Sequence, residues 1–209
     1  MDPSKNEPDP WAVPRHVKEI MAGFDRPWFL AGGWAIDLFV RRVTRAHADV
    51  EIAILREDQA PIRHYLEGWE FEKVSREPGG GRREPWRDEE RLDPPVHEIT
   101  ARRERGEPRE LEILLNEAEA GRWRFRRDPR IARPVTEIGF PATMGIPILA
   151  PEVVLLYKAK AARRRDEEDF RNALPLLGPE RRRWLRRALA TAHPGHRWMA
   201  RLAGPRQAR

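Results

Sequence analysis

The sequence predicts an α/β (α+β) protein with a small helical domain at its C-terminal end. Three observations lead to this fold class. Residues 28–59 have the pattern of a strand, a tight glycine turn, a helix and a second strand. Residues 96–116 have the pattern of a two-stranded hairpin around a turn-forming segment. From residue 150 onward the pattern changes to amphipathic helices. We therefore expect a loose N-terminus over 1–10, an α/β domain over 11–149 and a helical domain over 150–209.

The first strand and the glycine turn predict a seat for phosphate groups. Residues 28–31 form a short apolar run that is typical of a buried strand. Gly32 and Gly33 follow, and glycine lets the backbone turn sharply and approach a ligand closely. The helix that begins there directs the free N–H groups of its first turn at whatever lies above the glycines.

Two acidic residues precede the next apolar strand, which we expect over Asp49–Leu55. Because side chains alternate along a strand, Asp49 and Glu51 share one face. Two carboxylates held side by side repel each other unless a cation lies between them, and oxygen ligands suit Mg²⁺. A pair of acids at a strand end is weak evidence alone, since many strands end in acids. Its combination with the glycine turn predicts a site for magnesium and phosphate.

The string GGWAIDLFVRRVTRAHADVEIAI resembles the aminoglycoside adenylyltransferases of the gentamicin and kanamycin type and the lincosamide nucleotidyltransferases. These share G-G-W-x-x-D and T-R-x-H-x-D-x-D. This chain departs from them at Glu51, where they usually have aspartate, although the wider nucleotidyltransferase superfamily accepts glutamate. The resemblance extends over about residues 11–202. It implies a mixed-sheet nucleotidyltransferase fold that uses Mg²⁺ and ATP or another NTP.

The resemblance also implies further site residues. Glu112 matches a third carboxylate that would complete the metal site with Asp49 and Glu51, or take the proton from an attacking hydroxyl. Arg45 would grip phosphate, His47 would orient an acid or a phosphate, and Lys158 would reach the nucleotide. Each has a structural alternative: Glu112 as a solvent-facing residue, His47 as a structural hydrogen-bond partner and Lys158 as an exposed helix lysine. Glu110 is expected to face solvent.

Two segments admit more than one interpretation. Residues 76–95 are rich in glycine, proline and charge, so we expect no regular element, and such a loop is either a functional lid or disordered. Trp86 within it would stack on a ligand ring or pack on the surface. Arg126 and Arg127 would meet a triphosphate or close the site, or else belong to a salt-bridged surface.

Composition excludes some classes of protein. The 209 residues include no cysteine, which excludes a disulfide framework and fits a reducing, cytoplasmic location. No apolar run is long enough to cross a membrane. The net charge of +6 and pI near 10.2 raise the question of nucleic acid, but the basic residues are interleaved with acids. A solvated surface of mixed charge is the favoured interpretation.

The function expected from these features is transfer of AMP from ATP to a hydroxyl of a small molecule, with release of pyrophosphate. An aminoglycoside-like antibiotic is one such acceptor, and acids at 88–98 and 110 would line its cleft, yet a basic protein is a poor host for a polycation. One alternative is a nucleotidyltransferase that modifies tRNA or a protein partner, as in toxin–antitoxin pairs. Another is a non-catalytic nucleotide-binding relative. The sequence leaves the acceptor, the preferred NTP and the oligomeric state open.

Overall fold

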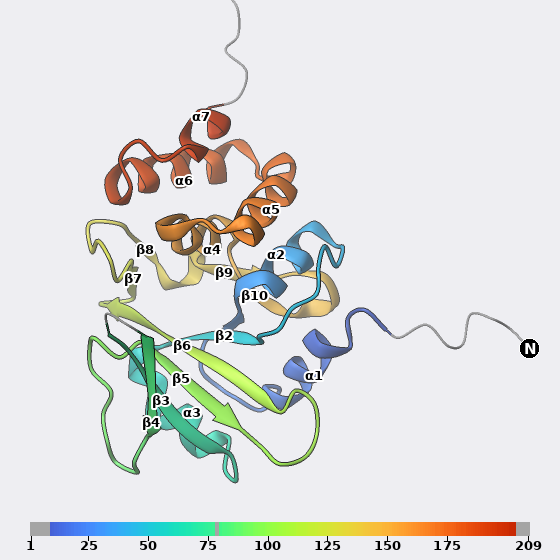
Figure 1. The fold of residues 1–209 in the computed structure, drawn as a ribbon, viewed down its shortest axis with the longest axis vertical. Coiled ribbons are helices and arrows are strands. Elements are labelled where there is room, and N and C mark those ends of the chain that lie inside the picture. The colour runs from blue at the N-terminus through green and yellow to red at the C-terminus, as the bar shows by residue number, and fades with distance from the viewer. Residues whose placement is uncertain (1–8, 78–79, 204–209) are drawn as a thin grey trace, which may run out of the picture.

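The computed structural model describes residues 9–77 and 80–203 and shows a mixed α/β fold (Figure 1). Its ten strands form a sheet in the order β4-β3-β5-β6-β2-β1-β10-β9, and β7 and β8 extend from β6. Two pairs, β1 with β10 and β2 with β6, are parallel, whereas the others are antiparallel. The mixed sheet expected from the resemblance is therefore confirmed. The predicted loose terminus over 1–10 lies outside the described residues up to position 8.

The strands range in length from three residues in β1 to ten residues in β6. Their bounds are β1 Trp28–Leu30, β2 Glu51–Leu55, β3 Glu70–Glu77, β4 Gly80–Pro85, β5 Glu98–Arg102, β6 Glu110–Glu119, β7 Arg122–Arg124, β8 Ala132–Pro134, β9 Gly139–Pro141 and β10 Pro147–Leu149.

The last four helices gather beyond one end of the sheet, and α2 packs against α4 and α5 of this group (Figure 1). The helix bounds are α1 Ala12–Ile20, α2 Gly32–Val40, α3 Gln59–Tyr65, α4 Pro151–Lys158, α5 Arg164–Ala173, α6 Pro179–Ala192 and α7 Trp198–Leu202. Pro151 occupies the first turn of α4, where its missing N–H costs no hydrogen bond. Among the described residues, no helix has the length and apolar character needed to cross a membrane.

The register of the central strands decides which acids share a face. Glu51 on β2 lies opposite Glu112 on β6, and Thr100 on β5 lies opposite Glu112 from the other side. Glu98, two residues before Thr100, therefore belongs to the same face, because side chains alternate along a strand. This face holds the candidate site.

The prediction that 76–95 lacks a regular element is wrong for β4, which pairs with β3 along its whole length. Charged and small residues form this strand because it is an edge strand, where polar side chains are tolerated and prevent association with another sheet. Trp86, at the end of β4, is only 3% exposed. Its ring contacts Phe71, and its indole N–H donates to the Glu90 carbonyl. Trp86 is thus a core residue; positions 78–79 lie outside the described residues.

Other differences from the predicted elements are smaller. The strand expected over Asp49–Leu55 begins at Glu51, and Asp49 is exposed just before it. Within the helical region expected from residue 150 onward, α5 begins at Arg164 and ends at Ala173. The sequence pattern predicted neither α7 nor β8, β9 and β10, because three-residue strands are too short to show a period.

Candidate active site

Two adjoining cavities lie where the sheet face meets the C-terminal helices. The larger has a volume of about 630 Å³ and the smaller about 40 Å³. Glu51, Lys158 and Arg163 line both. The predicted site residues divide between them: Gly32 lines the larger cavity, and Gly33, Arg45, His47 and Asp49 line the smaller one. Glu112 is in neither lining.

The two glycines are required by close contacts. Gly32 has a φ of +58°, and a Cβ there would come within 1.4 Å of a Glu51 carboxylate oxygen. A Cβ on Gly33 would come within 2.4 Å of both the Arg45 guanidinium and the His47 ring. Only glycine therefore lets the first turn of α2 lie against these side chains. Helix α2 begins at Gly32 itself, so the predicted turn is also the first turn of the helix.

A buried carboxylate on α2 holds the segment between α2 and β2. Asp37 is fully buried and accepts hydrogen bonds from the backbone N–H and hydroxyl of Thr44, at 3.1 and 2.6 Å. Its second oxygen also lies 2.6 Å from Nε2 of His47. The His47 side chain is 3% exposed and packs against the Trp34 ring. His47 is thus fixed with its Nδ1 edge over Gly33.

The two predicted cations share acidic partners from α5. Arg45 donates to both oxygens of Asp169 at 3.2 Å. Lys158 lies 2.9 Å from Asp169 and 3.1 Å from Asp166. Burial opposes the charge on Arg45, but its hydrogen bonds and the nearby carboxylates prevail and raise its pKa. The Lys158 side chain is 12% exposed, so the structure does not place it as a freely solvated helix lysine.

The Glu51 carboxylate lies in surroundings that disfavour its charged form. Burial raises its pKa; Lys158 acts in the opposite sense, whereas Asp49 and Glu98 raise it further. The Glu51 carboxylate makes no hydrogen bond or ion pair with any residue that the structure describes, whereas its backbone carbonyl accepts from the Ala31 N–H at 2.8 Å. A charged group in such a place is stabilised by a cation.

These residues fit a divalent cation in their chemistry, since carboxylate oxygens are the ligands that Mg²⁺ prefers. The side chains nevertheless stand apart: among the described residues, no three His, Cys, Asp or Glu form a metal-binding group. Asp49 lies close enough to Glu51 to contribute to the raised pKa of the Glu51 carboxylate. Glu112 lies beside Glu51 in the sheet.

The floor of the larger cavity is held rigid by an amide and two aromatic residues. Asn116 donates to the carbonyls of Ile54 and Leu114. Its side-chain oxygen accepts from the Trp123 indole and the Tyr157 hydroxyl, both at 3.1 Å. Burial raises the pKa of Tyr157 to about 12, so this phenol remains a hydrogen-bond donor at neutral pH.

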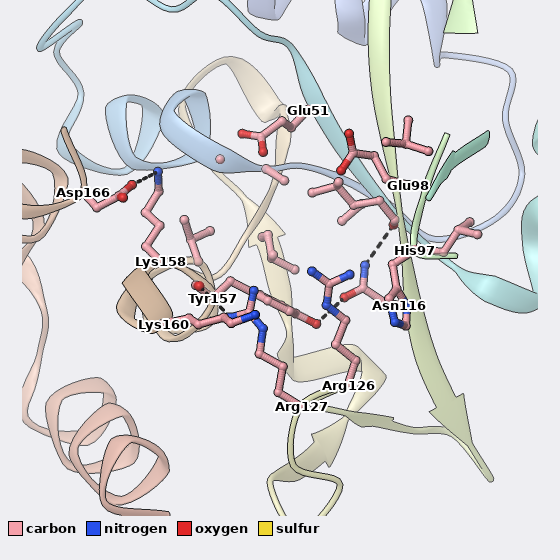
Figure 2. A pocket seen from close by; sticks show the side chains of 18 of the residues that line it. Glu51, His97, Glu98, Asn116, Arg126, Arg127, Tyr157, Lys158, Lys160 and Asp166 are labelled. Carbon is pink, nitrogen blue, oxygen red and sulfur yellow. Dashed lines mark hydrogen bonds and ion pairs between the residues drawn. The ribbon is translucent and has the colours of Figure 1, made fainter. Parts of the chain in front are cut away.

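Figure 2 shows the carboxylates of Glu51 and Glu98 at one end of the larger cavity, and Arg126, Arg127 and Lys160 at the other. Sequence reasoning gave Glu98 only as one of several acids of a cleft. No local pattern records its proximity to Glu51, which depends on the order of the strands. Asp37 did have a signal, as the single charged residue in an otherwise apolar helix.

Comparisons with known proteins identify a family model and solved structures that are similar to this chain. Residues 15–78 match the family model described as aminoglycoside-2''-adenylyltransferase. No curated protein matches the chain. Solved structures show the fold. The crystal structure of ANT(2'')-Ia in complex with adenylyl-2''-tobramycin is 21% identical with a TM-score of 0.55, covering 85% of this chain and 97% of that one.

A second solved structure is the lincosamide antibiotic adenylyltransferase LnuA, lincomycin-bound. It is 17% identical with a TM-score of 0.51, and the match covers 76% of this chain and 92% of that one. The chain therefore has the nucleotidyltransferase fold and resembles the aminoglycoside and lincosamide adenylyltransferases. These findings support an enzyme of the nucleotidyltransferase type.

Proposed function

We propose that this protein transfers a nucleoside monophosphate, AMP from ATP, to a hydroxyl group of a small molecule and releases pyrophosphate. One observation carries the proposal: the Glu51 carboxylate, which has no hydrogen-bond or ion-pair partner among the described residues, lies where a glycine-lined cavity with cations meets a larger cavity. The smaller cavity suits phosphate groups, because Gly33 leaves room at the start of α2 and the cations Arg45 and Lys158 are held beside it.

The residues around the two cavities have separate roles in the proposed reaction. Asp49 and Glu51, with Glu112 beside them, are the ligands for Mg²⁺, which when bound neutralises charge on the triphosphate. Gly32 and Gly33 admit the β- and γ-phosphates, and the rigid Asp37–His47 pair supplies a hydrogen-bonding edge next to them. The larger cavity, whose volume is in the range of small-molecule sites, holds the nucleoside and the acceptor.

The transfer needs a base. The acceptor oxygen attacks the α-phosphorus and forms a new P–O bond, the bond to the bridging oxygen of the β-phosphate breaks, and pyrophosphate leaves with the electron pair. The hydroxyl proton goes to a carboxylate. Glu112 is the base that the resemblance implies, and Glu98 is the one that lines the larger cavity together with Glu51.

The resemblance favours an antibiotic as the acceptor class, and the lack of cysteine favours a reducing compartment such as the cytoplasm. The test uses purified protein with α-³²P-labelled ATP, GTP or CTP, Mg²⁺ and a panel of tobramycin, lincomycin, bulk tRNA and cell extract. We expect pyrophosphate release with label on a small molecule. Label on tRNA or protein alone would refute the small-molecule acceptor, and absence of Mg²⁺-dependent nucleotide binding would refute the catalytic function.

A further inference from the structure

The larger cavity has opposite charges at its two ends. Glu51 and Glu98 lie at the end that adjoins the smaller cavity, and Arg126, Arg127 and Lys160 lie at the far end (Figure 2). A ligand that spans the cavity therefore meets acids at one end and three cations at the other.

The far cations are positioned by Tyr157 and its surroundings. The guanidinium carbons of Arg126 and Arg127 lie 5.6 and 5.5 Å from the centre of the Tyr157 ring, and Arg127 also donates to the Tyr157 carbonyl at 2.8 Å. Tyr157 is itself fixed by its hydrogen bond to Asn116. This end of the cavity is thus a built surface, since the two guanidinium groups lie over a fixed ring.

The cations at this end of the cavity lower the pKa of a neighbouring histidine. Burial lowers the pKa of His193, and Arg127 and Lys160 lower it further.

The triphosphate of the nucleotide does not account for these cations. Under the proposed function, on which this inference rests, its seat is the smaller cavity, where Arg45 and Lys158 lie with Arg163 and Arg165. That cavity adjoins the acidic end of the larger one, at Glu51. The basic end is left for the acceptor.

We propose that the acceptor is a small hydroxylated anion, whose phosphate or carboxylate group binds between Arg126, Arg127 and Lys160 while its hydroxyl faces Glu51 and Glu98. Arginine forks pair with both anionic groups through parallel N–H donors. A polycation such as an aminoglycoside would place ammonium groups against these three cations, which disfavours it.

Thermal shift separates the acceptor from the nucleotide. The protein is saturated with Mg²⁺ and the non-hydrolysable ATP analogue AMPCPP, and four ligands are then added: glucose 6-phosphate, glucuronate, uncharged glucose and tobramycin. We expect a further rise in Tm with one or both anions and none with glucose or tobramycin. A response to glucose 6-phosphate alone identifies the phosphate form, and one to glucuronate alone the carboxylate form.

Two variants localise the effect. Arg126→Gln/Arg127→Gln should abolish the rise caused by the anion and keep the rise caused by AMPCPP, and the single variant Lys160→Gln should weaken anion binding several-fold. The control Arg186→Gln/Arg187→Gln removes the same charge from exposed positions of α6 outside both cavities and should behave as wild type.

Three results overturn the inference: a rise with tobramycin and with neither anion, no ligand response at all, or loss of the AMPCPP response in the Arg126/Arg127 variant, which would assign this end to the triphosphate. If AMPCPP does not bind the wild type, the proposed function fails. An anion response without nucleotide that depends on Arg126 and Arg127 would then still support the anion site, and its absence would overturn it.

Discussion

Glu51 and Glu112 lie directly opposite each other on two parallel neighbouring strands, although helix α3 and the three strands β3, β4 and β5 separate them in the chain. Thr100 stands on the other side of Glu112, so these acids occupy adjacent rows of one sheet face. Glu98 belongs to the same face and reaches the cavity. Strand order therefore brings together the carboxylates that we propose for the site.

The first prediction concerns the cost of the Glu51 charge in the absence of ligands. Because burial and neighbouring acids raise its pKa, charging Glu51 at neutral pH opposes folding. Glu51→Gln should therefore raise Tm in EDTA at pH 7. Asp49→Asn should change Tm less, because Asp49 is exposed. With Mg²⁺ and AMPCPP, the wild type should gain stability and Glu51→Gln should not; equal gains would contradict the metal assignment.

The second prediction identifies the base. Either Glu98→Gln or Glu112→Gln should reduce kcat by roughly two to four orders of magnitude while nucleotide binding is kept, because a neutral amide accepts no proton. We expect the larger loss for Glu98→Gln, since Glu98 lines the cavity with Glu51. Glu110→Gln is the control, because Glu110 pairs with Arg102 on the sheet. Wild-type kcat in Glu98→Gln and a large loss in Glu112→Gln would restore the assignment that the resemblance implies.

The third prediction concerns the phosphate seat. Gly33→Ala should keep the fold but weaken binding of Mg²⁺·AMPCPP by at least an order of magnitude, because the new Cβ displaces the Arg45 guanidinium and the His47 ring. Circular dichroism checks the fold and titration calorimetry the affinity. Gly68→Ala is a matched control: its surroundings leave space for a Cβ, although its φ of +83° adds strain. Unchanged affinity in Gly33→Ala would rule out this seat.

The fourth prediction concerns the support beneath the larger cavity. Arg56 donates to the carbonyls of Leu92 and Val96 and to Glu117, so it ties the loop before β5 to β6. Arg56→Met leaves Glu117 and two carbonyls without their donor, and should lower the free energy of unfolding by about 2–4 kcal/mol.

The pH dependence gives a second measurement of the same contact. Burial opposes the charge on Glu117, but hydrogen bonds from His97 and Arg56 prevail and lower its pKa to about 2, below the usual 4.5. A lowered pKa contributes stability above pH 4.5 that is lost as the pH falls towards 2. Wild type should lose this increment on acidification, and Arg56→Met should lose less. Parallel acid profiles for the two proteins would contradict this.

Much of the site was predictable because its motifs are local. The glycines, Arg45, His47 and Asp49 lie within one short string, and the structure gathers them with Glu51 and Lys158 around two cavities. The hairpin and the mixed sheet were also predictable from alternation and resemblance. Strand β4 was not, because an edge strand rich in charge has the composition of a loop. Glu98 was missed because its proximity to Glu51 depends on the order of three strands, which no local pattern records.

The shared carboxylate of Asp169 limits how this chain can evolve. Arg45 belongs to the segment before β2, Lys158 to α4 and Asp169 to α5, yet one acid binds both cations. A recombination event that joined residues 1–149 to unrelated C-terminal helices would separate the arginine from its acid and leave a buried charge without its counterion. We therefore expect the helices after residue 150 to be inherited together with the glycine motif, and substitutions at positions 45 and 169 to covary among related chains.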